Sequence, residues 1–111
     1  MTPKELYDQC VASPDCDIQK HLPFLRSCAR GNVIEIGVRW GVSTAAFLLG
    51  LETNGGHLYS VDVNPDCASR FSHPQWSFLA ASSADASAVR RFAPASVSVL
   101  FIVGDHSYAA V

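Results

Sequence analysis

Two carboxylates in the sequence stand at or near the ends of β-rich segments, one of them beside two glycines, where a polar ligand could bind. Glu35 lies two residues before Gly37 in the stretch VIEIGVRWGVSTAAFLL, and Gly41 follows, which gives the spacing E-x-G-x-x-x-G. Glycine has no β-carbon, so it lets the backbone turn sharply and approach a ligand. A dinucleotide site would show G-x-G-x-x-G instead. Glu35 would repel a phosphate but favour an ammonium group, whereas a purely structural strand-to-helix turn is the alternative.

The second carboxylate, Asp62, ends the segment HLYSVD. It follows Glu35 at somewhat more than the roughly 20-residue interval at which an acidic residue meets a ribose in nucleotide-binding sheets. A carboxylate can accept hydrogen bonds from both hydroxyls of a vicinal diol. The two acids and two glycines together predict a ligand that has an amino group and a ribose and needs no phosphate cradle.

These residues need a scaffold, and the alternation of β-rich and helix-forming segments predicts one. Alternating strands and helices indicate a Rossmann-like α/β fold, a parallel sheet in the order 3-2-1-4 with helices on both faces. The 111 residues can bury one core, so we expect one domain over 1–111, with 1–30 as an N-terminal helical segment within it. The expected strands are 32–37, 57–62, 76–80 and 97–103, and the expected helices are 3–12, one ending at Arg30, 43–52, a short one after Asn64, and 83–92.

Several residues predict where these elements begin and end. Pro23 fits the first turn of the second helix, and Gly31 fits the position just past its end. Ser43 is placed to cap the helix over 43–52, and Pro65 fits the first turn of the short helix. In such sheets, ligands bind at the carboxyl ends of the strands. The segments to inspect are therefore 37–41, 62–64, 81–83 and 104–106.

Three segments resemble a known family when they are taken together and in order: VIEIGVRWGVST, LYSVDVNP and LFIVGDHSYAAV. They resemble the first half of a class I S-adenosylmethionine-dependent methyltransferase. The likeness is greatest to the bacterial family that includes the macrocin-type O-methyltransferases, whose members carry EIGxxxGxST and IDGDHSY. HLPFL before the first strand also fits that family. S-adenosylmethionine has the amino group and the ribose that the two carboxylates predict.

The resemblance implies roles for individual residues. Glu35, Gly37 and Gly41 would hold the methionine moiety of the cofactor, with Ser43 at the helix start, and Asp62 would bind the ribose hydroxyls. Ser82 and Ser83 stand where relatives often have Gly-Asp-Ser beside the adenine. Asp105 is a further polar residue at the fourth strand end. Helix capping is the alternative for these three residues.

The fourth segment departs from the family at Val103, where metal-dependent relatives have an aspartate similar in position to a Mg²⁺ ligand. Valine cannot coordinate a hard cation, which needs about six oxygen ligands. We therefore expect no metal site and no metal-dependent methyl transfer by this chain alone. His106 could act as a general base on an acceptor hydroxyl, or it could be a hydrogen-bonded structural histidine.

Composition excludes several other classes. The 8 basic and 10 acidic residues form no basic block, so neither nucleic acid nor anionic lipid is an expected partner. Without an apolar span or a signal peptide, the chain is expected to be cytoplasmic. The cysteines show no CxxC pair, which disfavours a zinc site.

The family usually continues for three more strands, so the chain reads as truncated after the fourth strand. An apolar fourth strand at the edge of the sheet would favour homo-oligomerisation. The expected function is O-methyl transfer to a small hydroxylated acceptor, with this chain carrying mainly the cofactor-binding half. The alternative is a non-catalytic cofactor-binding remnant or interaction module.

Overall fold

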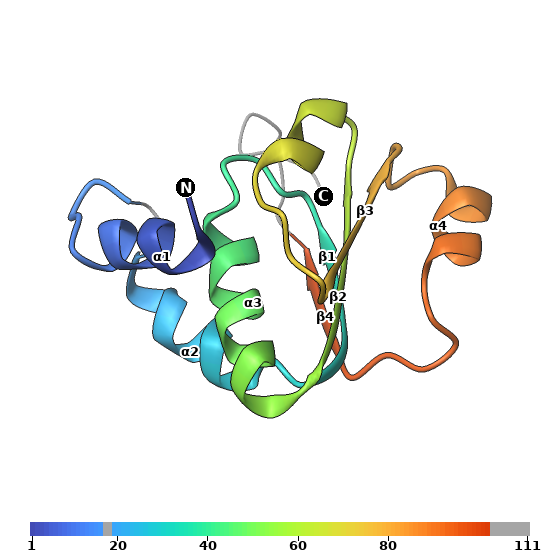
Figure 1. The fold of residues 1–111 in the computed structure, drawn as a ribbon. Coiled ribbons are helices and arrows are strands. Elements are labelled where there is room, and N and C mark those ends of the chain that lie inside the picture. Colours follow the sequence, from blue (N-terminus) through green and yellow to red (C-terminus); the bar gives the residue numbers. More distant parts are fainter. Residues whose placement is uncertain (17–18, 103–111) are drawn as a thin grey trace.

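The protein contains one four-stranded, all-parallel sheet in the order β3-β2-β1-β4, which confirms the predicted topology (Figure 1). The computed structural model describes residues 1–16 and 19–102. The strands are β1 (Gly31–Ile36), β2 (Gly56–Asp62), β3 (Trp76–Ala80) and β4 (Val99–Ile102). Their carboxyl ends meet at a single edge of the sheet, where parallel α/β folds bind ligands.

Helices cover both faces of this sheet. Figure 1 shows α1 (Pro3–Val11), α2 (Leu22–Cys28) and α3 (Val42–Asn54) on one side and α4 (Ala86–Phe92) on the other. Two short 3₁₀ helices complete the set: η1 (Gln19–His21) leads into α2, and η2 (Pro65–Ser69) connects β2 to β3. No helix in the described part of the chain is both long enough and apolar enough to cross a membrane.

The core lies between the sheet and the three helices on one face, and α3 is at its centre. Phe47, Leu48 and Leu51 of α3 are fully buried, together with Val33 of β1 and Leu58 of β2. Because α3 is enclosed by the sheet and by α1 and α2, it is apolar around most of its circumference. A β-carbon at Gly50 would stand 2.1 Å from the Arg26 carbonyl oxygen, so glycine is what allows α2 to pack this closely on α3.

The opposite face is covered only in part. Phe92 of α4 makes an edge-on contact with Tyr59 of β2, with ring centroids 5.7 Å apart. On β4, by contrast, Leu100 and Ile102 are 60% and 64% exposed. Within the described residues β4 pairs with β1 alone, so it is an edge strand as predicted. Its proposed part in oligomerisation stays a prediction.

Element ends differ from the sequence prediction where a tertiary contact replaces a local signal. The second helix ends at Cys28 rather than Arg30, and Gly31 is the first residue of β1, at φ 65°. The described part of β4 begins at Val99, two residues later than expected. The predictions for α1 and β3 are correct to within one residue, and Pro23 and Pro65 lie in first turns as predicted.

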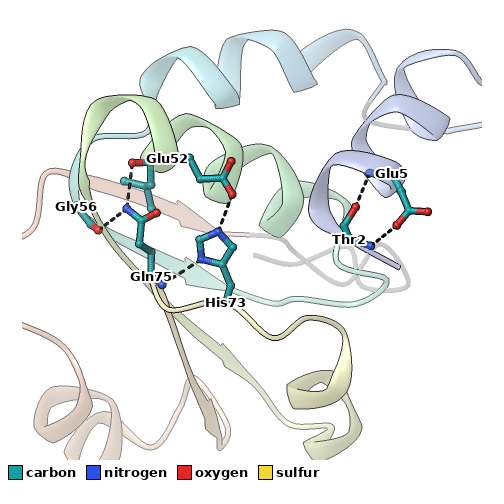
Figure 2. Close-up of polar contacts among 7 residues, drawn as sticks. Thr2, Glu5, Glu52, Gly56, His73 and Gln75 are labelled. Carbon is teal, nitrogen blue, oxygen red and sulfur yellow. Dashed lines mark hydrogen bonds and ion pairs between the residues drawn. The ribbon is translucent and has the colours of Figure 1, made fainter.

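Side chains close the amino edge of the sheet (Figure 2). The Gln75 amide donates to the carbonyl oxygens of Leu51 and Gly56, at 3.0 and 3.1 Å. His73 contacts the Glu52 carboxylate through Nε2 at 2.8 Å, while its Nδ1 accepts a hydrogen bond from the backbone N–H of Gln75. These bonds tie the end of α3 to the starts of β2 and β3. The same figure shows a separate capping box, in which Thr2 and Glu5 begin α1.

Candidate functional site

The loop after β1 has an unusual backbone. Gly37, Arg39 and Gly41 all have positive φ values, of 97°, 52° and 86°. Glycine adopts this region without strain, but a residue such as Arg39 does so at a cost that other contacts must offset. A β-carbon at Gly41 would also stand 3.1 Å from the Phe71 ring. The two glycines of the sequence motif are therefore required by the loop conformation itself.

Asp62, at the end of β2, supplies the contacts that hold this loop. Its Oδ2 accepts hydrogen bonds from the backbone N–H groups of Val38 (2.8 Å) and Arg39 (3.1 Å), and its Oδ1 accepts one from Asn64 (2.9 Å). Partial burial acts to raise the pKa of Asp62, but these three amide donors outweigh it and hold the pKa below its ordinary value. The carboxylate therefore stays ionised and fixes the loop onto the neighbouring strand.

The carbonyl oxygen of Arg39 faces the segment that follows β2. It accepts a hydrogen bond from Arg70 Nε at 3.1 Å, and the Cys67 thiol lies 3.6 Å from it. The Arg70 guanidinium also lies over the Trp40 ring, with Cζ 5.3 Å from the ring centroid. Trp40 itself is 75% exposed.

Glu35 lies beneath the loop and is fully buried. Its carboxylate accepts three hydroxyl hydrogen bonds, from Ser43 (2.5 Å) and Thr44 (2.6 Å) of α3 and from Ser60 (2.8 Å) of β2. Ser60 in turn accepts from the Trp76 indole N–H at 2.9 Å. Both carboxylate oxygens therefore have partners, and the network joins β1, β2, β3 and the first turn of α3.

Burial has a large effect on the ionisation of Glu35. Desolvation raises its pKa to about 7, against the opposing effect of the hydroxyl donors Ser43, Thr44 and Ser60, and the nearby charge of Asp62 raises it further. A carboxyl group with this pKa changes charge near neutral pH. Since it connects the sheet to the start of α3, its protonation state bears directly on the geometry of the site.

The start of α3 differs from the prediction. The helix begins at Val42, and Gly41 is its N-cap, with no side-chain cap among the described residues. Ser43 was expected to cap the helix, but it lies inside the first turn and its hydroxyl is bound to Glu35 instead. A buried carboxylate competes successfully for a hydroxyl donor because charge-assisted hydrogen bonds are the stronger ones. The first amides of α3 thus lack a capping side chain, a state that suits an anionic ligand group.

A family model described as a methyltransferase domain matches residues 34–111. The chain belongs to this methyltransferase family. The match begins at the strand that carries Glu35, and the parallel 3-2-1-4 sheet is consistent with the class I, S-adenosylmethionine-dependent methyltransferases. No curated protein matches the chain.

The described part of the methyltransferase domain brings most of the predicted site residues together at one edge. The loop begins at Gly37 and ends at Gly41, Ser43 follows it in α3, and Asp62 binds its amides. Glu35 lies below these residues. Ser82 and Ser83 lie further along that edge, in the exposed link after β3. The Ser82 hydroxyl accepts from the Ala84 amide.

Helix capping, the alternative for these two serines, is not what the structure places there. Asp85 caps α4 by accepting from the Ala88 amide at 3.1 Å, and the helix begins at Ala86, three residues later than predicted. A contact of Ser82 or Ser83 with adenine stays a prediction. Val103, Asp105 and His106 lie outside the described residues, so the interpretations of these three positions stay predictions too.

Sequence reasoning missed three residues that shape the site: Thr44, Ser60 and Arg70. Ser60 and Thr44 gave a signal that could have been used, because a polar residue within an apolar strand and another within an apolar helix can pair with a buried Glu35. Arg70 gave none, since it comes from a connection whose path only the folded chain defines.

Proposed function

We propose that the carboxyl edge of β1 and β2 binds S-adenosylmethionine and that the chain serves in O-methyl transfer to a small hydroxylated acceptor. The observation that carries this proposal is the folding of the 37–41 loop onto the Asp62 carboxylate. This arrangement places an ionised acceptor, a loop opened by two glycines and an uncapped helix start at the edge where such folds bind ligands. The macrocin-type O-methyltransferases remain the proposed subfamily.

The ribose fits Asp62. A carboxylate offers about four lone-pair sites, and backbone amides fill three of them here. The thiol of Cys67, a weak donor, is the other group that lowers the Asp62 pKa. Asp62 is only part-buried, so a ribose hydroxyl can donate to Oδ1, the oxygen that accepts a single amide bond. In this proposal Asp62 both shapes the loop and contacts the ligand.

The methionine moiety fits the start of α3. Its carboxylate would accept from the first amides of the helix, where the helix dipole favours negative charge. Glu35 does not contact the ammonium group directly, because its carboxylate is fully buried and bound to three hydroxyls. We assign Glu35 two indirect effects: it fixes Ser43 and Thr44, and its charge below the loop attracts a cation.

In methyl transfer the cofactor supplies an electrophilic methyl group on its sulfonium. The residues of this chain hold the donor still, so that an acceptor oxygen can approach in line with the bond that breaks. Gly37 and Gly41 allow the loop conformation on which this binding depends. His106 remains the proposed general base, and Ser82, Ser83 and Asp105 remain the proposed further contacts to the cofactor.

Calorimetric titration with S-adenosylmethionine and its demethylated product tests the binding step. We expect both to bind with one ligand per chain, and NAD⁺ to give no heat of binding because the phosphate cradle of a dinucleotide site is missing from the motif. Asp66→Ala is the matched control for Asp62→Ala, since the Asp66 carboxylate is exposed on η2 near Asp62. No binding of either compound to the parent chain would contradict the proposal.

A transfer assay tests the chemical step. The parent and Val103→Asp are incubated with methyl-labelled cofactor and a panel of catechols and sugars, with and without Mg²⁺. We expect no magnesium stimulation of the parent, since an isopropyl group offers no lone pair to a cation. Magnesium-stimulated turnover by the parent would refute this expectation. Cofactor binding with no transfer to any acceptor would favour the binding-module alternative.

A further inference from the structure

A large aromatic side chain is exposed beside the proposed cofactor site. Trp40 is the most exposed large hydrophobic residue in the described part of the chain. One guanidinium, that of Arg70, lies over its ring. Tryptophan and arginine are the residue types most enriched where proteins bind their ligands and partners, because both offer a flat surface that also makes polar contacts.

The pair is held in place before any ligand arrives. The amides of Val38 and Arg39 are bound to Asp62, which fixes the loop that carries Trp40. Arg70 donates from Nε to the Arg39 carbonyl, so the guanidinium that stacks on the indole is also tied to the loop. A prearranged surface loses little conformational entropy on binding, which favours affinity.

The charge at this surface is positive and unbalanced. Within residues 1–16 and 19–102, neither Arg39 nor Arg70 forms an ion pair; the pairs found there are Lys4–Asp8 and His73–Glu52. The ionised Asp62 carboxylate is close by and offsets one of these two charges, which leaves one positive charge in excess. The chain as a whole has a net charge of −2. The Arg70 guanidinium over the exposed indole, with Arg39 exposed next to Trp40 in the same loop, therefore offers a local site for an anion attached to a planar ring.

S-adenosylmethionine matches this charge poorly, because its sulfonium gives it a net positive charge. Its one carboxylate is assigned above to the first amides of α3, so an anion for the guanidiniums comes from the second ligand. We infer that Trp40, Arg70 and Arg39 recognise the methyl acceptor, and that this acceptor is a hydroxylated aromatic compound with a carboxylate or phosphate group. Its ring stacks on Trp40 and its anionic group binds the guanidiniums. This inference rests on the proposed function and names the substrate class for the same site.

Binding of three probes tests the inference: 3,4-dihydroxybenzoate, phenyl phosphate and uncharged catechol. Each is titrated into the parent chain, both alone and saturated with S-adenosylhomocysteine. We expect at least one of the two anions to bind about tenfold or more tightly than catechol, as charge-assisted hydrogen bonds predict. The stronger of the two identifies the anionic group as carboxylate or phosphate.

Variants separate the roles of ring and charge. Arg70→Gln should remove the advantage of the anion over catechol and leave catechol unchanged, and Arg39→Gln should have the same effect to a smaller degree. Trp40→Leu should weaken all three probes about equally. Arg90→Gln on α4 is the matched control, because this arginine is exposed and remote from the loop. S-adenosylhomocysteine should bind Trp40→Leu and Arg90→Gln as it binds the parent. Arg70→Gln also loses the bond to the Arg39 carbonyl, so its effect is judged by the ratio of anion affinity to catechol affinity.

Three outcomes would overturn the inference: anions that bind no better than catechol, an Arg70→Gln effect equal for anions and catechol, or a loss of S-adenosylhomocysteine affinity in Trp40→Leu. The last would mean that the cofactor covers the indole. If S-adenosylhomocysteine fails to bind while the anions bind through Arg70, the proposed function fails and the anion surface stands. If S-adenosylhomocysteine binds and the anions do not, the proposed function stands and the inference about the acceptor fails.

Discussion

Glycines at the two edges of the sheet have different structural roles. At the amino edge, Gly31 and Gly56 bring two strand starts together, and a β-carbon at Gly56 would stand 2.1 Å from the Gly31 carbonyl oxygen. Gln75 and His73 then bind the remaining polar groups (Figure 2). At this edge glycine allows two backbone segments to pack closely, and the polar groups named here are hydrogen-bonded within the protein.

At the carboxyl edge, Gly37 and Gly41 instead allow the positive φ values of the loop between β1 and α3. Asp62 holds the loop, yet the start of α3 has no side-chain cap in the described chain, and Trp40 projects into solvent. The comparison teaches that a positive φ at glycine does not by itself mark a ligand site. What marks it is whether the neighbouring polar groups are satisfied internally, and substitutions at the two edges should separate stability from affinity.

The largest effect is expected for Gly56→Ala. The new side chain would collide with the Gly31 backbone, and residue 56 has a φ value of 129°, so overpacking and backbone strain act together. We expect a loss of roughly 3 kcal/mol or more in the free energy of unfolding. Urea denaturation followed by circular dichroism measures it. The affinity of the folded fraction for S-adenosylhomocysteine should not change.

Gly41→Ala is the counterpart at the carboxyl edge. Its β-carbon would meet side chains rather than backbone, the Phe71 ring at 3.1 Å and the Arg70 β-carbon at 3.7 Å, so the stability loss should be smaller, about 1 to 3 kcal/mol. Cofactor affinity should fall, because the loop conformation changes. Equal stability losses with unchanged affinity in both variants would contradict the distinction between the edges.

The second prediction concerns pH and the carboxyl edge. Because burial raises the pKa of Glu35 from an ordinary 4.5 to about 7, the folded chain keeps a proton that the unfolded chain loses in that range. Stability should therefore decline as pH rises from about 4.5 to 7, by about 3 kcal/mol in total. Urea denaturation at intervals across this range measures the slope. Glu35→Gln should remove this decline.

Asp62 titrates in the opposite sense and serves as the control. Its pKa is lowered by the amide donors, so its contribution is complete above its ordinary value of 3.8 and is lost as pH falls through the folded value. Asp62→Asn should alter the acid limb and leave the decline from pH 4.5 to 7 in place. Parallel stability curves for the parent and Glu35→Gln would show that the buried carboxyl group does not titrate there.

The third prediction is a loss of cofactor affinity in Asp62→Ala. Removing a charged acceptor of the ribose should cost on the order of 1.5 to 3 kcal/mol, or about ten- to a hundredfold in affinity. The loop amides also lose their partner, so Asp62→Asn, which keeps one acceptor oxygen, should lose less. Calorimetry with S-adenosylhomocysteine compares the three proteins. Unchanged affinity in Asp62→Ala would exclude its role in binding ribose.

The smallest effect is expected for Gln75→Ala at the amino edge. Two carbonyl oxygens, of Leu51 and Gly56, lose this donor, but the Leu51 oxygen keeps the Gly55 amide at 2.8 Å and the bond to the Gly56 oxygen is exposed. We expect a loss of about 1 kcal/mol in the free energy of unfolding and no change in cofactor affinity. A tenfold loss of affinity in this variant would show that the two edges are coupled.

The sequence by itself determined the order of strands and helices, the parallel topology and the positions of the glycine loop and Asp62. These follow from local properties: β-branched runs form strands, prolines and glycines limit helices, and short parallel crossovers allow few arrangements. The same local rules placed α1 and β3 closely. The roles of Ser82, Ser83, Asp105 and His106 were also read from sequence, and they stay predictions.

Only the tertiary structure decided which partner each polar group takes. Ser43 looked like a helix cap by position, but the buried Glu35 carboxylate, brought close by the packing of α3 on the sheet, competes for its hydroxyl. Arg70 comes to lie over Trp40 because the chain after β2 returns across the 37–41 loop. Such contacts join residues far apart in sequence, and their energies depend on burial, which no local pattern encodes.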